Sequence, residues 1–454
     1  MDKQDTICAV STPPGEGGIG IIRISGTKAI ALVSGVFKPR RGKQFAEEKT
    51  HTLHYGHVVD PRSGNTVDEV LVSIMRAPAT YTREDVVEIN CHGGMAPLWR
   101  IVSILITAGA RQAEPGEFTK RAFLNGRIDL VQAEAVMDII HAKTELSHQA
   151  ANELLLGGLS IEVTALRDRL VSLIASVEAG IDFPEDEIET LLPISDEIEG
   201  TLQKVNDLLD SYTYGRIIRD GFAAAIVGRP NVGKSSLLNA LLKHDRAIVT
   251  DIPGTTRDIL EEYLNIVGVP LRILDTAGIR HSHDLVEQEG VRRSLAAIES
   301  ADIVVVVLDG SQPLSAEDRR VLDQARGKTS IAIINKADLP RVMEDLAFPE
   351  MQVTLSCKTG AGLEDLRQIL STSIRQGGMA PREHTWAINQ RHKTALKQAR
   401  ESLDKSLVSV QSGLSPEFTA MDLRGALDSL GLIVGATYTE DILERIFSEF
   451  CIGK

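Results

Sequence analysis

The residues best suited to chemistry form the run Gly-Arg-Pro-Asn-Val-Gly-Lys-Ser at 228–235. The run fits the pattern G-x-x-x-x-G-K-[ST], in which glycines let backbone amides wrap a row of phosphates. In such a loop Lys234 would neutralise the β- and γ-phosphates, and Ser235 would offer its hydroxyl to Mg²⁺. A predicted strand at 224–227 precedes the run and a predicted helix follows it, as the pattern requires. The run therefore predicts a site for a nucleoside triphosphate.

Two further motifs indicate the base of that nucleotide. Asn-Lys-Ala-Asp at 335–338 follows a predicted buried strand at 331–334. The carboxylate of Asp338 can accept hydrogen bonds from N1–H and the N2 amine of guanine, a donor pair that adenine lacks. Ser-Cys-Lys at 356–358 ends the last predicted strand, from which it would contact the base from the other side. We expect base contacts from Asn335, Lys336, Asp338, Ser356, Cys357 and Lys358.

The γ-phosphate side is predicted from two more segments. Asp-Thr-Ala-Gly at 275–278 follows a strand, which places Asp275 near Mg²⁺ and the Gly278 amide near the γ-phosphate. The run at 250–256 can supply Thr256 to Mg²⁺ and further oxygens to a second cation, and Asn231 favours the same interpretation. Ile279 stands where small Ras-like GTPases place a water-orienting Gln. The predicted GTP contacts on this side are Asn231, Val232, Gly233, Lys234, Ser235, Ser236, Thr250, Thr256, Asp275, Thr276, Ala277 and Gly278, with Ser235 and Thr256 as Mg²⁺ ligands.

The elements that must position these motifs follow from hydrophobic periodicity. Between 222 and 373 predicted strands alternate with helical segments, which is typical of a doubly wound parallel sheet. The stretches on either side, 119–219 and the chain after 381, show apolar residues at helical spacing. Because domains are often inserted at exposed loops, we assign both stretches to one interrupted helical domain. Residues 7–113 carry short β-rich runs and one helical stretch, which predicts a separate α/β domain.

Composition narrows the class of protein. The 454 residues, 43% of them hydrophobic and 25% charged, indicate a folded protein of about three domains. The N-terminal residues do not resemble a signal peptide and no apolar run is long enough to span a bilayer, so we expect a cytoplasmic protein without a membrane. The four cysteines are widely scattered, which predicts reduced thiols. A net charge of −14 opposes non-specific binding to nucleic acid, so any such role requires a local patch or a partner.

Three regions of the chain resemble the MnmE (TrmE) family of tRNA modification GTPases. They are the runs at 14–26, 115–118 and 121–127; the loops Gly-Thr-Thr-Arg-Asp at 254–258 and Asp-Thr-Ala-Gly-Ile-Arg at 275–280; and Phe-Cys-Ile-Gly-Lys at 450–454. The resemblance implies an α/β plus α architecture with three domains. These are an N-terminal α/β tetrahydrofolate-binding and dimerisation domain at 1–118, a helical domain at 119–219 and 379–454, and an inserted Ras-like P-loop G domain with a doubly wound sheet at 220–378.

The same resemblance implies roles for single residues. A K⁺ ion held by Asn231, Thr250, Ile252 and Thr255 would let two G domains dimerise and would replace an arginine finger. Glu287 matches the water-orienting glutamate and fills the gap left by Ile279. A tetrahydrofolate derivative, in its 5,10-methylene or 5-formyl form, would contact Arg23, Glu88, Arg127 and Lys454, although relatives can carry Lys in place of Arg127. The implied catalytic residues are Glu287, Cys451 and Lys234.

Family members act with the FAD protein MnmG, as a heterotetramer around a homodimer formed through the N-terminal domain. Together they build a 5-carboxymethylaminomethyl or aminomethyl group on the wobble uridine of certain tRNAs. Two other functions stay open on the sequence alone. A GTP-dependent ribosome-assembly switch shares the phosphate loop but predicts a second G domain or an RNA-binding module. A stand-alone folate-dependent aminomethyltransferase leaves the G domain without a purpose.

Three smaller features have competing interpretations. Gly15-x-Gly17-x-x-Gly20 matches a dinucleotide-binding pattern, but it leads into a predicted strand instead of a helix, so we interpret it as a glycine-rich turn. Cys91-His92 lacks nearby partners for a metal and is predicted to be a turn near the folate pocket. Arg257 and Arg280 border the two loops of the γ-phosphate side, where they could stabilise charge or pair with other acids.

Overall fold

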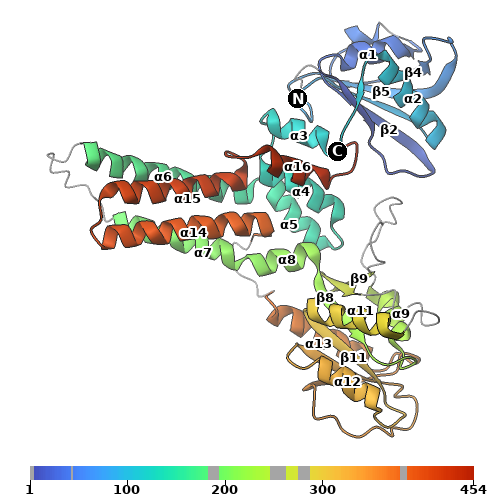
Figure 1. The fold of residues 1–454 in the computed structure, drawn as a ribbon. Helices are drawn as coiled ribbons and strands as arrows, with labels where there is room; N and C mark the ends of the chain where they lie inside the picture. The colour runs from blue at the N-terminus through green and yellow to red at the C-terminus, as the bar shows by residue number, and fades with distance from the viewer. Residues whose placement is uncertain (1–4, 42–43, 183–193, 246–261, 275–286, 379–385) are drawn as a thin grey trace. The chain divides into compact units, whose positions relative to one another are not determined.

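The computed structural model describes all residues except 1–4, 42–43, 183–193, 246–261, 275–286 and 379–385 (Figure 1). Contacts divide the chain into two compact units. Among the described residues, the first comprises those up to Met137 and Gly431–Lys454, and the second comprises those between 138 and 430. The predicted boundaries of the three domains stay a proposal.

The first unit is built on a seven-stranded sheet with the order β3-β4-β5-β6-β2-β1-β7. Its strands are β1 (Ile7–Val10), β2 (Gly17–Ser25), β3 (Phe37–Pro39), β4 (Thr52–Val59), β5 (Thr66–Met75), β6 (Val86–Gly93) and β7 (Arg111–Gln112). Neighbouring strands are antiparallel except β1 and β7, which are parallel. Helices α1 (Ala29–Val36) and α2 (Met95–Ala108) pack on the apolar face of this sheet, and a 3₁₀ turn, η1 (Phe45–Glu47), lies beside α1.

The alternation of side chains along β2 and β6 decides what the other face carries. Ile22 and Ile24 belong to the core beneath α1 and α2, so Arg23 between them lies on the opposite face. The register of the two strands then places Arg23 directly opposite Glu88. Cys91 and His92 were predicted as a turn, and this prediction is wrong because both lie within β6. Gly17 is the first residue of β2 and Gly20 lies within it, so the rejection of a dinucleotide-binding motif agrees with the strand. The predicted glycine-rich turn is wrong for these two residues.

The face that carries Arg23 is partly covered by helix α3 (Glu117–Leu124). Phe118 of α3 packs against Ile7 and Ala9, the residues of β1 that alternate with the buried Cys8. Helix α16 (Glu440–Ser448) contacts α3, and the aromatic rings of Phe123 and Tyr438 meet edge to face at 5.3 Å. The two ends of the chain are thereby joined in one unit.

The second unit contains the remaining helical elements. They are α5 (Glu145–Leu155), α6 (Gly158–Asp182), α7 (Ile194–Asp210), α8 (Tyr212–Asp220), α14 (Gln390–Gln411) and α15 (Pro416–Val434); the division between the units falls inside α15 and inside α4 (Leu130–His141). Helix α14 packs against α7, and Arg424 of α15 forms an ion pair with Glu178 of α6. The helices that flank the α/β part in sequence therefore pack with one another, as the insertion hypothesis requires (Figure 1).

The inserted part is a six-stranded sheet with the order β13-β12-β11-β8-β10-β9. Its strands are β8 (Phe222–Val227), β9 (Glu262–Ile266), β10 (Val269–Leu274), β11 (Ile303–Asp309), β12 (Ser330–Asn335) and β13 (Met351–Thr354), and its described helices are α9 (Lys234–Asp245), α11 (Glu287–Ser300), α12 (Ala316–Gln324) and α13 (Leu363–Gln376). All pairs are parallel except β9 with β10. The predicted doubly wound sheet is confirmed, and β9 is an edge strand that the sequence analysis did not identify.

Burial on both faces explains why β11 is a continuous apolar run. Ile303, Val305 and Val307 face a core shared with α9 and α13. Val304 and Val306 face a second core shared with α11 and α12. A parallel sheet covered by helices on both sides needs apolar residues at every position, not only at alternate ones.

A testable consequence concerns Gly215, at which α8 approaches the segment that follows the inserted sheet. A Cβ at Gly215 would lie 2.6 Å from the backbone nitrogen of Ile388. We expect Gly215→Ala to destabilise this unit by about 1–3 kcal/mol, the usual cost of overpacking. Gly200→Ala is the matched control, because a Cβ there meets nothing within 4 Å and alanine favours a helix by about 0.5–1 kcal/mol. Calorimetry that shows equal melting for both variants would contradict the close approach.

Candidate functional site

The phosphate loop lies at the carboxyl end of β8, immediately before α9. Gly228 has φ of +149° and a Cβ there would lie 2.4 Å from the carbonyl oxygen of Val307. Gly233 has φ of +104° and a Cβ there would lie 2.2 Å from Nδ2 of Asn335. Both positions require glycine, because the backbone has positive φ and because a side chain would collide with its neighbour. Asn231 also has positive φ, at +65°, which asparagine tolerates better than most residues.

The side chain of Lys234 folds back onto the phosphate loop. Its ammonium donates hydrogen bonds to the carbonyl oxygens of Gly228 at 2.6 Å and Arg229 at 2.9 Å. Burial lowers the pKa of Lys234, because it disfavours the charged ammonium. An anion such as a phosphate beside Lys234 would stabilise that charged form. Ser235 and Ser236 are exposed in the first turn of α9, where hydroxyls and backbone amides can meet phosphates, and Val232 is fully buried beneath the loop.

Asn335 connects the phosphate loop with the loop predicted to contact the base. Its Nδ2 donates to the carbonyl oxygen of Val232 at 2.8 Å, and its Oδ1 accepts from the backbone N–H of Cys357 at 3.2 Å. The side chain is 3% exposed, so both amide groups are satisfied in a dry environment. In the structure this residue is therefore a brace between two binding loops.

Asp338 and Ser356, which the sequence analysis placed on opposite sides of the base, contact each other in the structure. Ser356 Oγ donates to Asp338 Oδ1 at 2.7 Å, and Lys358 Nζ lies 4.0 Å from Asp338 Oδ2. The hydrogen bond from Ser356 lowers the pKa of Asp338, which keeps the carboxylate ionised. An ionised carboxylate with one oxygen anchored is a suitable acceptor for the paired N–H groups of guanine.

One residue of this site was missed by the sequence analysis. Asp309, at the end of β11, accepts a hydrogen bond from Lys336 Nζ at 2.6 Å and another from the backbone N–H of Ser311 at 3.0 Å. Burial opposes the negative charge of Asp309, but these hydrogen bonds outweigh it and lower its pKa. The available signal was its place at the carboxyl end of a predicted buried strand, beside the strands that carry the other motifs.

Several predicted residues lie outside the described part of the chain. They are Thr250, Ile252, Thr255, Thr256, Asp275, Thr276, Ala277 and Gly278, together with Arg257 and Arg280. Glu287 is the first residue of α11, but its side chain is outside the described part too. The roles predicted for these residues stay predictions.

A second cluster lies on the first unit and collects all four residues predicted to bind folate. Arg23 Nε and Nη2 each lie 2.8 Å from Glu88 Oε1. The guanidinium carbons of Arg23 and Arg127 lie 5.5 Å and 4.7 Å from the centre of the Tyr81 ring. Burial lowers the pKa of Lys454, the charge of Arg23 lowers it further, and Glu88 acts in the opposite direction. Tyr81 connects the cluster, and the sequence analysis did not identify it.

The C-terminal residues lie against this cluster. The carbonyl oxygen of Gly453 accepts hydrogen bonds from Ser11 Oγ at 3.1 Å and Arg23 Nη1 at 3.4 Å. Gly453 has φ of +98°, and a Cβ there would lie 2.3 Å from the carbonyl oxygen of Val10, so glycine is required. Cys451 is exposed, whereas Cys8 and Cys91 are buried and Cys357 is half-buried, with a pKa raised by burial to about 11 in each of these three.

Comparisons with known proteins cover the whole chain. The model of the MnmE helical domain matches residues 130–451, and the model of the GTP-binding protein TrmE N-terminus matches residues 6–127. The tRNA modification GTPase MnmE of Thermoanaerobacter pseudethanolicus is 48% identical over 457 residues, which is 99% of each chain. The proteins of that name from Alkaliphilus oremlandii and Geobacillus thermodenitrificans are 48% and 46% identical over 100% of each chain. The chain belongs to the MnmE family.

Membership of the MnmE family extends over the parts outside the nucleotide motifs, which confirms the resemblance noted from the sequence. Because a ribosome-assembly switch would share only the G domain, this match favours the MnmE interpretation over that alternative. Within the described residues, no helix is both long and apolar enough to cross a membrane.

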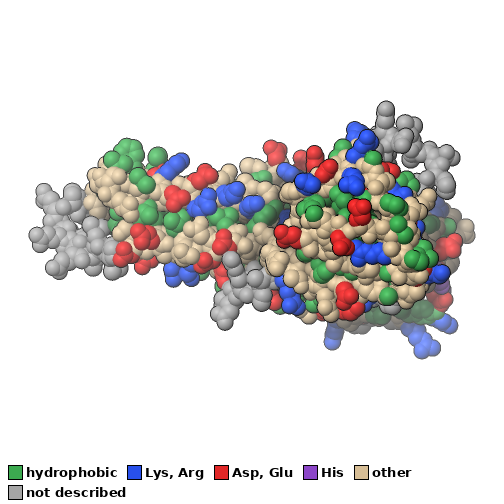
Figure 2. All heavy atoms as spheres, turned by 90° about the horizontal axis from the view of Figure 1, so that it is seen from below, with side chains coloured by type: hydrophobic (Ala, Val, Ile, Leu, Met, Phe, Trp, Pro, Cys, Tyr) green, Lys and Arg blue, Asp and Glu red, His purple; other side chains and the backbone are tan. Residues whose placement is uncertain are grey.

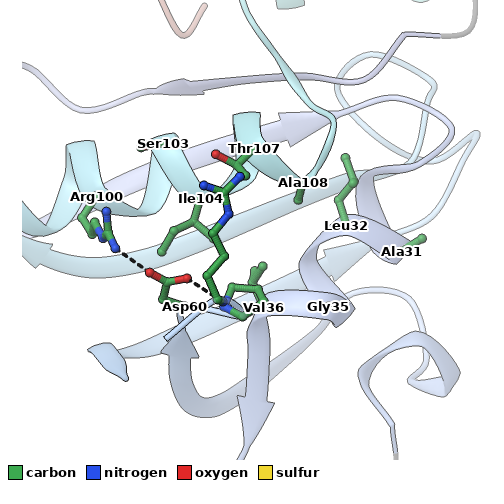
Figure 3. Close-up of a pocket in the computed structure, with 12 residues that line it drawn as sticks. Ala31, Leu32, Gly35, Val36, Asp60, Arg100, Ser103, Ile104, Thr107 and Ala108 are labelled. Carbon is green, nitrogen blue, oxygen red and sulfur yellow. Dashed lines mark hydrogen bonds and ion pairs between the residues drawn. The ribbon is translucent and has the colours of Figure 1, made fainter. Parts of the chain in front are cut away.

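A cavity of about 430 Å³ lies elsewhere on the first unit (Figure 3). It is bounded by α1, α2 and the turn between β4 and β5, and Arg100 reaches Asp60 at its rim. None of the residues predicted from the MnmE family lines it. The described residues among those predictions lie instead at the carboxyl edge of the β8 sheet and in the cluster around Tyr81.

Asp338 offers a direct test of base recognition. Asp338→Asn keeps an oxygen that can accept from N1–H of guanine, but its amide nitrogen would face the N2 amine, so two donors would meet. Xanthine has a carbonyl oxygen in place of that amine, and the new amide nitrogen can donate to it. We expect GTP affinity to fall about 100-fold and xanthosine triphosphate affinity to rise, measured by titration calorimetry. Asp309→Asn is the matched control, because it removes a neighbouring carboxylate that contacts Lys336 and should not invert the preference. Equal loss for both nucleotides in Asp338→Asn would exclude Asp338 as the base-reading residue.

Proposed function

We propose that this chain is a K⁺-stimulated GTPase that acts with MnmG to form the 5-carboxymethylaminomethyl or aminomethyl group on the wobble uridine of certain tRNAs, with carbon from a methylene-tetrahydrofolate. The observation that carries the proposal is that Arg23 and Arg127 meet at the Tyr81 ring, with Glu88 paired to Arg23 and Lys454 within the electrostatic influence of both. These residues come from distant parts of the sequence. A GTPase that acted only as a binding switch would give no reason for them to meet.

The donor set fits a tetrahydrofolate. Glu88 is a carboxylate acceptor of the kind that pairs with the amine and ring N–H of a pterin. The Tyr81 ring is an apolar surface for an aromatic part, and the Arg127 guanidinium beside it suits the carboxylates of the glutamate tail. When bound, the folate would supply the one-carbon group, while Arg23 and Lys454 would orient it. Cys451, whose side chain is exposed, is the residue we assign to the group-transfer chemistry.

The nucleotide loop fits GTP with Mg²⁺. Ser235 lies in the first turn of α9, where its exposed hydroxyl can be a metal ligand, and Thr256 would complete the pair. For K⁺ we propose Asn231 together with Thr250, Ile252 and Thr255. Asn231 has positive φ and is exposed in the phosphate loop. Its side-chain amide oxygen can therefore reach a cation. Lys234 would stabilise the transferred charge, and Glu287 would orient the attacking water.

The proposed assembly is a cytoplasmic homodimer formed through the N-terminal domain, joined by MnmG into a heterotetramer that receives tRNA. Charge supports the need for a partner. Over the described atoms of the face in Figure 2, Lys and Arg side chains are interspersed with Asp and Glu, and the net charge is −14. Such a surface gives weak non-specific attraction for a polyanion.

The function is tested by mass spectrometry of nucleosides in tRNA from cells with and without this protein. We expect the C5-modified wobble uridine to disappear in its absence and to return with the wild-type chain. A chain with Lys234→Ala should fail to restore it, because phosphate binding is lost. Unchanged nucleosides in cells that lack the protein would refute the proposal.

The K⁺ assignment is tested by GTP turnover in KCl and in NaCl at equal ionic strength. We expect kcat at least about tenfold higher in KCl, since the cation stabilises transition-state charge in place of an arginine. Asn231→Gly should abolish the difference, because it removes the amide and retains a residue that adopts positive φ. Asn239→Ala, at an exposed position of α9, is the control and should leave the difference intact. Equal rates of the wild type in both salts would exclude the K⁺ site.

A further inference from the structure

The C-terminal tail occupies the N-terminal end of helix α3. Amides in the first turn of a helix have no acceptor within the helix. The backbone N–H of Phe118 donates to the carbonyl oxygen of Lys454 at 3.1 Å, and that of Gly116 donates to the carbonyl oxygen of Cys451 at 3.4 Å. Pro115 and Ile452 form an isolated antiparallel bridge between the same segments. The first turn of α3 thus fixes the tail through backbone groups.

That first turn is itself fixed by a buried charge. Glu117 is fully buried, and its Oε1 accepts from Arg111 at 2.6 Å and from Arg121 at 2.9 Å. Its Oε2 accepts from the backbone N–H of Glu114 at 2.9 Å and from Arg111 at 3.0 Å. Burial opposes the charge of Glu117, but these donors outweigh it and lower its pKa. All of the contacts restrain the turn that begins α3.

The same network reaches the other elements of the cluster. Arg121 also contacts Asp5 Oδ1 at 2.5 Å, two residues before β1, and Glu84 at 3.2 Å, in the loop that carries Tyr81. Glu84 in turn accepts from Ser25, the last residue of β2, at 2.7 Å. One ion network therefore connects α3 with the strand that holds Arg23 and with the loop that holds Tyr81.

A movement of this turn would change two contacts of Phe118 at once. Its backbone N–H holds the tail, and its ring lies 5.7 Å from the guanidinium carbon of Arg23. Glu117 is adjacent to Phe118, and its carboxylate points into the ion network. The hydrogen bonds described for this carboxylate go to Arg111, Arg121 and the backbone of Glu114, and none goes to Glu88 or Lys454. Its influence on the cluster is exerted through Phe118 and the tail.

We propose that Glu117, held between Arg111 and Arg121, is a positioning residue that sets the place of Cys451 and Lys454 against Arg23 and Glu88. Its effect on chemistry rests on the proposed one-carbon site, whereas its effect on the tail does not. A buried ion network that only stabilised the fold would not control the tail specifically. The two possibilities differ in what happens to the tail when the charge is removed.

The experiment is the release of Lys454 from the full chain by a carboxypeptidase specific for basic residues, followed by intact mass. Glu117→Gln keeps the shape but weakens three charge-assisted hydrogen bonds, two from Arg111 and one from Arg121, so we expect release about tenfold faster than in the wild type. Asp60→Asn is the matched control, because Asp60 is 5% exposed, forms an ion pair with Arg100 in the same unit and does not contact the tail. Its melting temperature should fall while release of Lys454 stays unchanged.

Release at the same rate in Glu117→Gln and Asp60→Asn would overturn the proposal and leave Glu117 a stabilising residue. If Glu117→Gln does not fold, Arg111→Gln replaces it, because Arg111 is 41% exposed and its loss removes one donor of the pair. Binding of 5-formyltetrahydrofolate is measured in parallel. No binding by the wild-type chain would refute the one-carbon site alone, while faster release in Glu117→Gln would still support the positioning role.

Discussion

The hydrogen bonds of the Asn335 side chain connect two loops on which the nucleotide site depends. The phosphate loop follows β8 and the base loop follows β13, and between them in the sheet lie β11 and β12. Asn335 leaves the end of β12 and binds the backbone of both loops, at Val232 and Cys357. Because the strands are parallel, their carboxyl ends meet at one edge, and a short amide can bridge loops that are far apart in sequence. Asp309 and Asp338 are held at the same edge by Lys336 and Ser356.

The first unit achieves the same result with different means. Its sheet is almost wholly antiparallel, so the register of β2 and β6 places Arg23 opposite Glu88 without any loop. The rest of the cluster arrives from outside the sheet, with Tyr81 from a loop, Arg127 from beyond α3 and Lys454 from the end of the chain. Cross-strand register is rigid, whereas a terminal tail is usually mobile. An ion network at the start of α3 is therefore a reasonable device for the tail, since removing one partner of a buried pair leaves an uncompensated charge.

Glycine positions show how close the backbones approach at both sites. Gly228 and Gly233 lie where any side chain would collide with β11 or with Asn335, and Gly453 lies where one would collide with β1. Each has positive φ as well, so the sequence pattern and the packing impose the same residue for two reasons. The phosphate loop and the tail are in this sense alike, because each depends on contact with a backbone carbonyl oxygen of a neighbouring strand.

The sequence by itself determined the doubly wound sheet, the phosphate loop and the identity of the family, because periodicity and contiguous motifs are local properties. It failed for β9, whose place is decided by the hairpin with β10, and for Cys91 and His92, which a sheet partner draws into β6. Tyr81 had no local signal, and the roles of Asp309 and Glu117 come from partners distant in the chain, although Asp309 ends a predicted strand and Glu117 lies in the run 115–118. Only the tertiary structure decided which carboxylates face which cations, because a buried ion pair depends on distances that no local pattern encodes.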